Sequence, residues 1–349
     1  MVSPNHSEIK ADAAIPVASL TEYFCKRYGT TVTIVGAKVA SEGMSDDTWM
    51  VDVETPAGVE ELVVRRYRSG GALREETDSE RHFRILRGIP SEQIPVPEAL
   101  WFESEPEVAG GPFFVMRRVH GRIVVPWSAE GRDFLADAGR GVLGEQFVTT
   151  LADIHGLDWR AGGLEFLGAK AEGEGADDAA RRIEAMRGVV ERYQLEPEPV
   201  LMDALGWLED NKPEQARTGF IHGDYRTGNI VWGEDGINAV LDWEFARVGD
   251  PACDLGWLLC RTNRMGSDLA CYMLGRERVL ALYQRHAGWV PSEQSLKFWE
   301  ILELVRNTGL WLSGEFNYVN GATSELALAR WSYTLPNMRS MLLDALEEA

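Results

Sequence analysis

The feature that most constrains this chain is one stretch late in the sequence, FIHGDYRTGNIVWGEDGINAVLDWEFARVGDPACDL, which runs from Phe220 to Leu255. His222, Asp224 and Asn229 stand in it between two apolar runs, and Asp242 directly follows a short strand-like run. Phosphoryl transfer needs such a set of side chains. One carboxylate accepts the proton of an attacking hydroxyl, while an Asn oxygen and a second carboxylate hold Mg²⁺ on the phosphates. The stretch therefore predicts a site for that chemistry.

The ordered motifs HGDYRTGN, LDWE and GDPACDL resemble those of the aminoglycoside phosphotransferase and choline kinase family, which is related to the protein kinases. A lone HxD is a weak signal, but HxDxxxxN followed by DxE and then GDPxxDL is specific as an ordered set. The particular residues of these three motifs look most like those of the subgroup associated with acyl-CoA dehydrogenases. The alternative, that His222 and Asp224 are only turn and capping residues, accounts for single residues but not for the set.

The resemblance assigns roles to the residues of this stretch. It implies that Asp224 is the general base or the carboxylate that orients the hydroxyl, and that Asn229 and Asp242 hold Mg²⁺. His222 would support the loop through hydrogen bonds rather than react. Arg226 either neutralises the transferred phosphate or is simply exposed, and the sequence leaves both readings open.

Two further acidic residues of the stretch are expected to have structural roles. Asp254 opens an apolar helical run, and its carboxylate is placed to accept backbone N–H bonds from the catalytic loop. Asp250 beside Pro251 is expected to start that helix. His155, in the run LADIH, is also interpreted as structural.

The resemblance also implies a nucleotide site for ATP in the first third of the chain. Gly43 and Ser45 lie in a turn between two strand-like runs, which would cover the phosphates with backbone N–H groups. Arg65 stands where the pattern has a phosphate-binding lysine. Met116 and Val119 fall at the hinge that would contact the adenine.

Arg65 is preferred to its neighbour because it shares a strand face with Val63 and Tyr67, whereas Arg66 is then expected to be solvated. The pattern also has a glutamate that orients the phosphate-binding residue, but His82 occupies that position. Glu76 and Glu80 are candidates that the spacing does not separate.

The fold class that follows is α+β: a two-lobed protein-kinase-like fold with a small antiparallel-sheet lobe, residues 1–118, and a large helical lobe, residues 119–349. Strand-like runs cover 31–39, 48–54, 60–67, 99–103 and 113–116, which predicts a sheet of about five strands. Helical periodicity covers 16–28, 73–86, 132 onward, 179–193, 199–211, 269–286, 292–312 and 323–346. In the resembled family the last helices form the acceptor pocket, so the candidates there are Glu300, Glu303, Arg306, Glu315 and Tyr318.

Composition excludes some classes of protein. The formal net charge of −20 is spread evenly along the chain, which argues against nucleic-acid binding. No run reaches the roughly 20 apolar residues of a membrane span, and the first residues lack a secretory pattern, so we expect a cytoplasmic protein. Four cysteines fit no metal spacing, and three of them are expected to pack as small hydrophobes in apolar helices. The oligomeric state is left open.

The sequence thus predicts an ATP- and Mg²⁺-dependent phosphotransferase that acts on a hydroxyl group of a small molecule. The acceptor is a hydroxy-acid or hydroxyacyl metabolite, or an aminoglycoside-like antibiotic. The alternative is a catalytically inactive nucleotide-binding module, which the missing lysine and displaced glutamate suggest. A metal hydrolase is disfavoured, because no His-rich ligand set accompanies the carboxylates.

Overall fold

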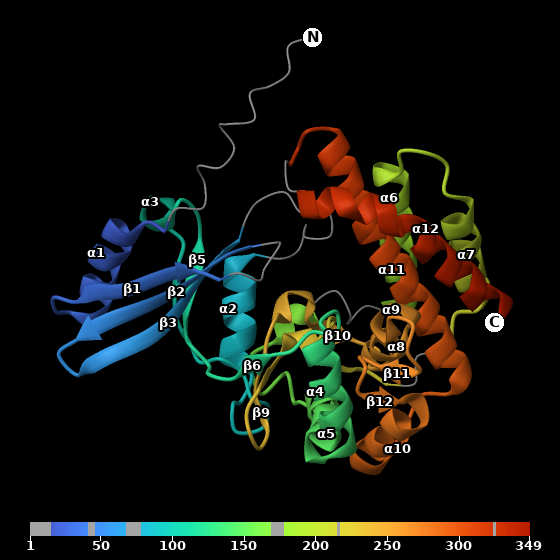
Figure 1. The fold of residues 1–349 in the computed structure, drawn as a ribbon, viewed down its shortest axis with the longest axis horizontal. Helices are drawn as coiled ribbons and strands as arrows, with labels where there is room; N and C mark the ends of the chain where they lie inside the picture. Colours follow the sequence, from blue (N-terminus) through green and yellow to red (C-terminus); the bar gives the residue numbers. More distant parts are fainter. Residues whose placement is uncertain (1–14, 41–45, 68–77, 169–177, 215–216, 324–325) are drawn as a thin grey trace, which may run out of the picture. The chain divides into compact units, whose positions relative to one another are not determined.

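The computed structural model describes residues 15–40, 46–67, 78–168, 178–214, 217–323 and 326–349. The chain divides into two compact units. The first consists of residues 1–87 and 97–119, and the second of residues 88–96 and 120–349. Figure 1 shows the course of the chain through both.

The first unit is built on an antiparallel sheet of five strands, as the sequence predicts. The strand order is β1-β2-β3-β5-β4, and every neighbouring pair is antiparallel. The strands are β1 (Thr33–Val39), β2 (Asp46–Thr55), β3 (Gly58–Tyr67), β4 (Ala99–Glu103) and β5 (Phe113–Arg117).

Alternation along β3 divides its side chains between the two faces of this sheet. Leu62 and Val64 belong to the buried cluster that also contains Leu20 and Phe24 of α1 (Val17–Tyr28). Successive side chains of a strand point to opposite faces, so Val63, Arg65 and Tyr67 lie on the other face. There α2 (Ser79–Gly88) packs, with the ring of His82 5.0 Å from that of Phe114 in β5. The first unit also contains the short helix α3 (Pro106–Ala109).

The second unit is mainly helical. The long helix α11 runs through it and packs against α6, α7, α8 and α12 (Figure 1). Its start is capped by Ser292, whose hydroxyl accepts a bond from the Ser295 N–H, as expected at a helix N-terminus. The helices are α4 (Ala129–Arg140), α5 (Val142–His155), α6 (Asp178–Tyr193), α7 (Pro199–Asp210), α8 (Ala252–Leu259), α9 (Arg261–Arg264), α10 (Arg276–Ala287), α11 (Glu293–Val319) and α12 (Leu326–Glu347).

Two small sheets of the second unit carry the stretch that the sequence singled out. β7 (Gly219–Ile221) pairs with β10 (Arg247–Gly249). β8 (Ile230–Trp232) lies between β6 (Arg122–Ile123) and β9 (Ile237–Val240). The loop after β7 and the loop after β9 are therefore held side by side, because each connects one of these ladders to the other.

The helix expected over residues 269–286 begins later than predicted. Residues 269–275 form a hairpin of β11 (Leu269–Ala270) and β12 (Leu274–Gly275), and α10 starts only at Arg276. Cys271 and Tyr272 have φ angles of 51° and 58°, a left-handed conformation that no α-helix contains. Local periodicity favours a helix here, but the chain turns back instead.

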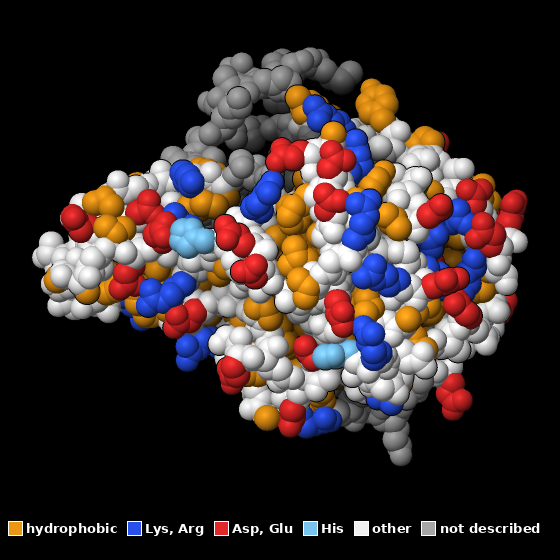
Figure 2. All heavy atoms as spheres, turned by 60° about the horizontal axis from the view of Figure 1, so that its bottom comes forward, with side chains coloured by type: hydrophobic (Ala, Val, Ile, Leu, Met, Phe, Trp, Pro, Cys, Tyr) orange, Lys and Arg blue, Asp and Glu red, His pale blue; other side chains and the backbone are white. Residues whose placement is uncertain are grey.

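On the face that Figure 2 shows, acidic and basic side chains are interspersed. Among the described residues, no helix is both long and apolar enough to cross a bilayer.

Candidate active site

Asp224 and Asn229 are joined directly in the loop after β7. The Asn229 Nδ2 amide donates to the Asp224 carboxylate at 2.8 Å and to the Asp224 main-chain oxygen at 2.9 Å. Asn229 ends the 3₁₀ turn η3 (Thr227–Asn229) and is 2% exposed. Because the amide nitrogen is engaged with Asp224, the amide oxygen is the atom that remains for a metal.

Asp242 lies beside this pair, because its neighbour Leu241 is bonded to the same loop. The Leu241 N–H donates to the Asn229 carbonyl at 2.8 Å, and the Leu241 carbonyl accepts from His222 Nε2 at 2.9 Å. Asp242 then adopts φ 59° and ψ 54°, a conformation unusual outside glycine that ends the strand sharply. The second loop therefore brings Asp242 close enough to the first for the charges of Asp224 and Asp242 to act on the same guanidinium, that of Arg226.

Arg226 connects the two carboxylates electrostatically. Its Nε lies 3.3 Å from the Asp224 carboxylate, and its side chain is 31% exposed. The negative charge of Asp224 raises the pKa of this guanidinium, and Asp242 adds to the effect. The sequence left open whether Arg226 neutralises the transferred phosphate or is simply exposed. In the structure its guanidinium is paired with Asp224, the candidate base.

His222 is fully buried and engaged at both ring nitrogens. Nε2 donates to the Leu241 carbonyl, and Nδ1 accepts the Asp224 N–H at 3.1 Å. Burial lowers the pKa of the imidazole, so the ring is neutral with its proton on Nε2. The ring thus ties the loop after β7 to the loop after β9.

Asp254 holds the backbone of the loop after β7, as the sequence predicts. Its carboxylate, 0% exposed in α8, accepts the backbone N–H groups of His222 at 2.7 Å and Gly223 at 2.8 Å. Asp250 starts α8 by accepting the Ala252 N–H at 2.9 Å. Both carboxylates thus hold the backbone in place.

In the first unit, the register of the sheet places Arg65 opposite Phe114 and Val63 opposite Met116. Arg65 is half-buried, and its guanidinium lies 5.9 Å from the centre of the Tyr67 ring. Met116 is 9% exposed, and Val119 follows the end of β5 by two residues. The other two predicted nucleotide contacts, Gly43 and Ser45, lie outside the described residues.

The prediction that Arg66 is solvated is wrong. Its side chain is 15% exposed and forms an ion pair with Asp47, which is itself 2% exposed. The guanidinium also donates to the Ala109 carbonyl and lies 5.4 Å from the Trp49 ring centre. Arg66 points to the face that α1 and α3 cover, and sequence alternation alone could not show which face that is.

The position expected to hold a glutamate has a different partner. His82 is 3% exposed, and its Nδ1 lies 2.9 Å from the Tyr67 hydroxyl. Glu80 is exposed, and Glu76 lies outside the described residues. Sequence reasoning identified His82 but not its pairing with Tyr67.

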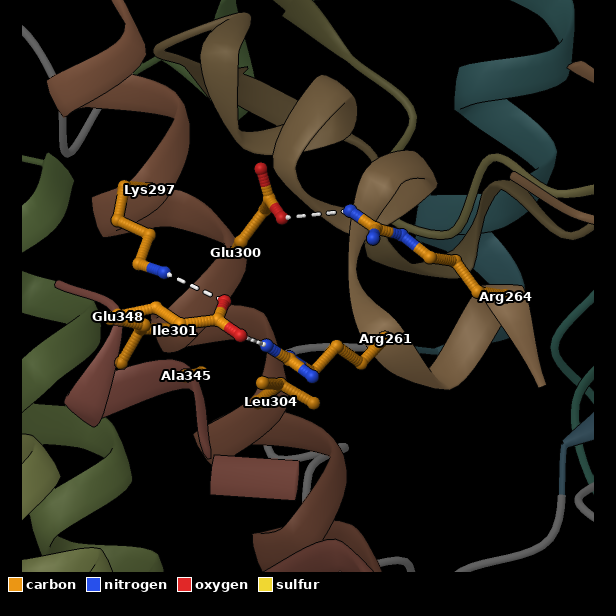
Figure 3. Close-up of a pocket in the computed structure, with 8 residues that line it drawn as sticks. All are labelled: Arg261, Arg264, Lys297, Glu300, Ile301, Leu304, Ala345 and Glu348. Atoms are coloured by element: carbon orange, nitrogen blue, oxygen red, sulfur yellow. Dashed lines mark ion pairs between the residues drawn. The ribbon is translucent and has the colours of Figure 1, made fainter. Parts of the chain in front are cut away.

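Glu300, one of the candidates for the acceptor pocket, has its carboxylate engaged in ion pairs. Figure 3 shows it beside a small cavity of about 40 Å³ between α9, α11 and α12. Its carboxylate pairs with Arg276 and with Arg264, the latter at 3.5 Å. A cavity of this size holds little more than a water molecule, and its charged lining is already paired.

Glu303 is likewise buried, in a cluster of charges that the sequence did not reveal. It is 1% exposed and accepts from Arg182 at 2.6 Å, from the Cys253 thiol at 3.2 Å and from Arg306. Arg247 also donates to Cys253, at 2.9 Å. The surroundings of Cys253 are therefore charged, and the four cysteines, all described, form no disulfide.

The side chains at this site suit a Mg²⁺ ion that also binds substrate phosphates, rather than a metal ion held by the protein alone. Within the described ranges, no group of three or more His, Cys, Asp or Glu side chains is arranged to hold a metal ion. Mg²⁺ is usually bound through one or two carboxylates together with water and substrate phosphates. The Asn229 amide oxygen and the Asp242 carboxylate supply such a set.

Comparison with known proteins identifies the class. The model of the phosphotransferase enzyme family matches residues 36–299. The chain therefore belongs to this family, and the predicted class of enzyme, a phosphotransferase, is confirmed.

Individual relatives agree with this assignment and with the fold. A putative aminoglycoside phosphotransferase from Ralstonia eutropha superimposes with a TM-score of 0.72 at 20% identity, covering 96% of this chain and 99% of the other. ADP-bound APH(2'')-Ib gives a TM-score of 0.53 at 15% identity, over 93% of this chain and 99% of the other. The predicted kinase-like fold is thereby confirmed.

Among sequence relatives, the chicken acyl-CoA dehydrogenase family member 11 is 28% identical over 342 residues, which cover 93% of this chain and 42% of that protein. The predicted resemblance to a subgroup associated with acyl-CoA dehydrogenases is confirmed. The chain spans less than half the length of such relatives.

Proposed function

We propose that this chain transfers the γ-phosphate of ATP to a hydroxyl group of a small molecule in a Mg²⁺-dependent reaction. The observation that carries the proposal is the bonded pair Asp224–Asn229 with Asp242 on the adjoining loop. These are a base and two metal ligands of the types and in the order that phosphoryl transfer requires.

Each residue of the loop then has one task. Asp224 orients the acceptor hydroxyl and takes its proton as the oxygen attacks phosphorus in line. Asn229 and Asp242 would hold Mg²⁺, which neutralises charge on the phosphates. Arg226, paired with Asp224, adds positive charge beside the transferred group. His222, neutral and bonded on both sides, holds the two loops together and exchanges no proton.

We assign the nucleotide to the first unit, with Arg65 on the phosphates and Met116 and Val119 near the adenine. The turn with Gly43 and Ser45 belongs to the same proposal. It is supported by the orientation of β3, since Arg66 is committed to Asp47 on the opposite face. The ADP bound to the neighbour APH(2'')-Ib also supports a nucleotide substrate.

Replacing Asp224 with Asn tests the catalytic assignment. The variant keeps the shape of the loop but removes the base, so we expect turnover to fall at least about 1,000-fold with ATP affinity retained. Asp235→Asn, an exposed carboxylate in the turn between β8 and β9, is the matched control and should behave as the wild type. Turnover retained in Asp224→Asn would refute the role of Asp224.

Arg65→Met and Arg66→Met separate the two arginines. Loss of Arg65 should raise the Kd for Mg-ATP about 10-fold to 100-fold and leave the unfolding midpoint nearly unchanged. Loss of Arg66 should lower the midpoint instead, because it removes the Arg66 guanidinium from its ion pair with the buried Asp47 carboxylate. The assignment of Arg65 fails if the two variants show the reverse pattern.

For the acceptor, we propose a metabolite that carries a hydroxyl on an acid or acyl chain, supported by relatives named as acyl-CoA dehydrogenase family members. The solved neighbours that are aminoglycoside phosphotransferases support a competing antibiotic acceptor. ADP release measured over matched panels of hydroxy acids, their acyl-CoA esters and aminoglycosides decides between them.

A second candidate is a nucleotide-binding module without catalysis. It is favoured by Arg65 in the place of a lysine and by the Tyr67–His82 contact in the place of a glutamate. Mg-dependent ATP binding and ADP release measured in one preparation separate the two. Binding without release over the whole acceptor panel would favour the module.

A further inference from the structure

A continuous line of buried polar groups runs from the catalytic loop into the second unit. Asp254 in α8 accepts the loop N–H groups and also contacts His155 Nε2 of α5 at 3.2 Å. His155 Nδ1 in turn lies 2.7 Å from the hydroxyl of Tyr283 in α10. Asp254 and Tyr283 are 0% exposed, and His155 is 8% exposed. Three helices therefore meet behind a single loop.

The hydrogen bonds along this line all donate towards Asp254. Burial alone would raise the pKa of Asp254, but its hydrogen bond with His155 lowers it, so the carboxylate is ionised and only accepts. Burial raises the pKa of Tyr283, which therefore keeps its hydroxyl proton. Because Asp254 only accepts and Tyr283 donates its hydroxyl hydrogen, His155 donates to Asp254 from Nε2 and accepts from Tyr283 at Nδ1.

The loop at the end of the line has little freedom of its own. Gly223 has a φ of +84°, and a Cβ there would lie 2.6 Å from the Phe245 carbonyl, so the backbone is pressed against the neighbouring loop. Asp224 follows immediately and is held on its other side by Asn229. The Gly223 N–H bond to Asp254 thus fixes the backbone at the residue immediately before the candidate base.

We propose that His155 and Tyr283 are positioning residues for the phosphotransfer. Tyr283 fixes the tautomer of His155, and His155 fixes the carboxylate of Asp254. Asp254 in turn sets the backbone that carries Asp224. The inference rests on the proposed role of Asp224. Outer residues that orient a reactive group through hydrogen bonds change rates without touching the substrate.

Three substitutions test it on the full chain: His155→Leu, His155→Gln and Tyr283→Phe. His155→Leu should lower kcat about 100-fold, because small displacements of a catalytic group have costs of that order. Tyr283→Phe should lower kcat about 3-fold to 10-fold, the worth of one hydrogen bond. His155→Gln can place an amide N–H where Nε2–H stands, so it should recover most of the rate. KM and Kd for ATP should stay within about 2-fold in all three, as expected when only the loop moves.

Amide hydrogen exchange of His222 and Gly223 supplies a readout that does not depend on turnover. Exchange at these two amides should rise in His155→Leu and return towards the wild-type value in His155→Gln. Thr308→Val is the control. It removes another buried side-chain hydrogen bond, from Thr308 Oγ1 to the Leu304 carbonyl, and should leave both kcat and the loop amides unchanged.

Two results would overturn the proposal: equal kcat for His155→Leu and the wild type, or a rise in exchange over the whole second unit that Thr308→Val reproduces. If Asp224→Asn retains turnover while the loop amides still respond to His155→Leu, the proposed role of Asp224 fails and the positioning line stands. If Asp224→Asn is inactive and the loop amides are unaffected, the positioning proposal fails alone.

Discussion

Replacing Glu303 with Gln probes the buried charge cluster of the second unit. The carboxylate is 1% exposed and accepts from two arginines, Arg182 and Arg306, and from the thiol of Cys253. Burial would raise its pKa, but the arginines lower it, so Glu303 is ionised. Gln keeps the shape of the side chain but turns an N–H group towards one of the guanidinium groups.

The expected cost follows from these contacts. Removing one partner of a buried ion pair costs about 3–5 kcal/mol. Gln retains one acceptor oxygen, so the free energy of unfolding should fall by about 3 kcal/mol, near the lower limit of that range. A domain has about 5–15 kcal/mol in total, so this is a large fraction.

Urea unfolding followed by circular dichroism at neutral pH measures the change. The midpoint should fall while the slope of the transition stays constant, because the surface exposed on unfolding is the same. Asp137→Asn is the matched control. Its carboxylate pairs with Arg140 at the surface, with side-chain exposures of 78% and 76%, and its removal should cost under about 0.5 kcal/mol. A loss below about 1 kcal/mol in Glu303→Gln would refute the reasoning, because it would mean that the guanidinium groups are stable without the carboxylate.

Two other predictions concern pH and packing. Burial raises the pKa of Asp250 from 3.8 to about 6, so its contribution to stability is present below its unfolded pKa and lost as the pH rises through 6. Asp250→Asn should therefore be more stable than the wild type at pH 8 by roughly 2–3 kcal/mol and equal to it at pH 3; equal urea midpoints at pH 8 would contradict this. A Cβ on Gly139 would lie 1.9 Å from the Met273 carbonyl, so Gly139→Ala should lower the urea midpoint by the equivalent of more than about 2 kcal/mol. Gly188→Ala, with open space around its Cβ in α6, should be neutral or stabilising, and equal midpoints for the two alanine variants would contradict the close packing.

The grouping of the candidate site residues could be predicted because its information is local. His222, Asp224 and Asn229 lie within one loop, and Asp242 follows a strand short enough to be recognised from its apolar run. Asp254 could be assigned as a support for the same reason, since its helix begins a few residues further on. The contacts in the second unit agree with this ordering of residues.

The partners of buried groups could not be predicted in this way. His155 and Tyr283 are 128 residues apart in the chain, and Arg182 and Glu303 are 121 apart. No spacing rule connects such positions, because their contact depends on how several helices pack together. The sequence therefore pointed to His155 and Glu303 singly and did not reveal their partners Tyr283 and Arg182.

What the sequence by itself determined is the class of fold and the residues of the candidate site, since alternation, helical periodicity and short motifs are properties of neighbours in the chain. The tertiary structure alone decided which face of β3 packs against α1 and α3, and so that Arg66 is buried against Asp47 while Arg65 lies on the other face. It also decided that residues 269–275 turn back on themselves instead of extending α10. In both cases the local pattern allows either outcome, and packing against elements distant in the chain selects one of them.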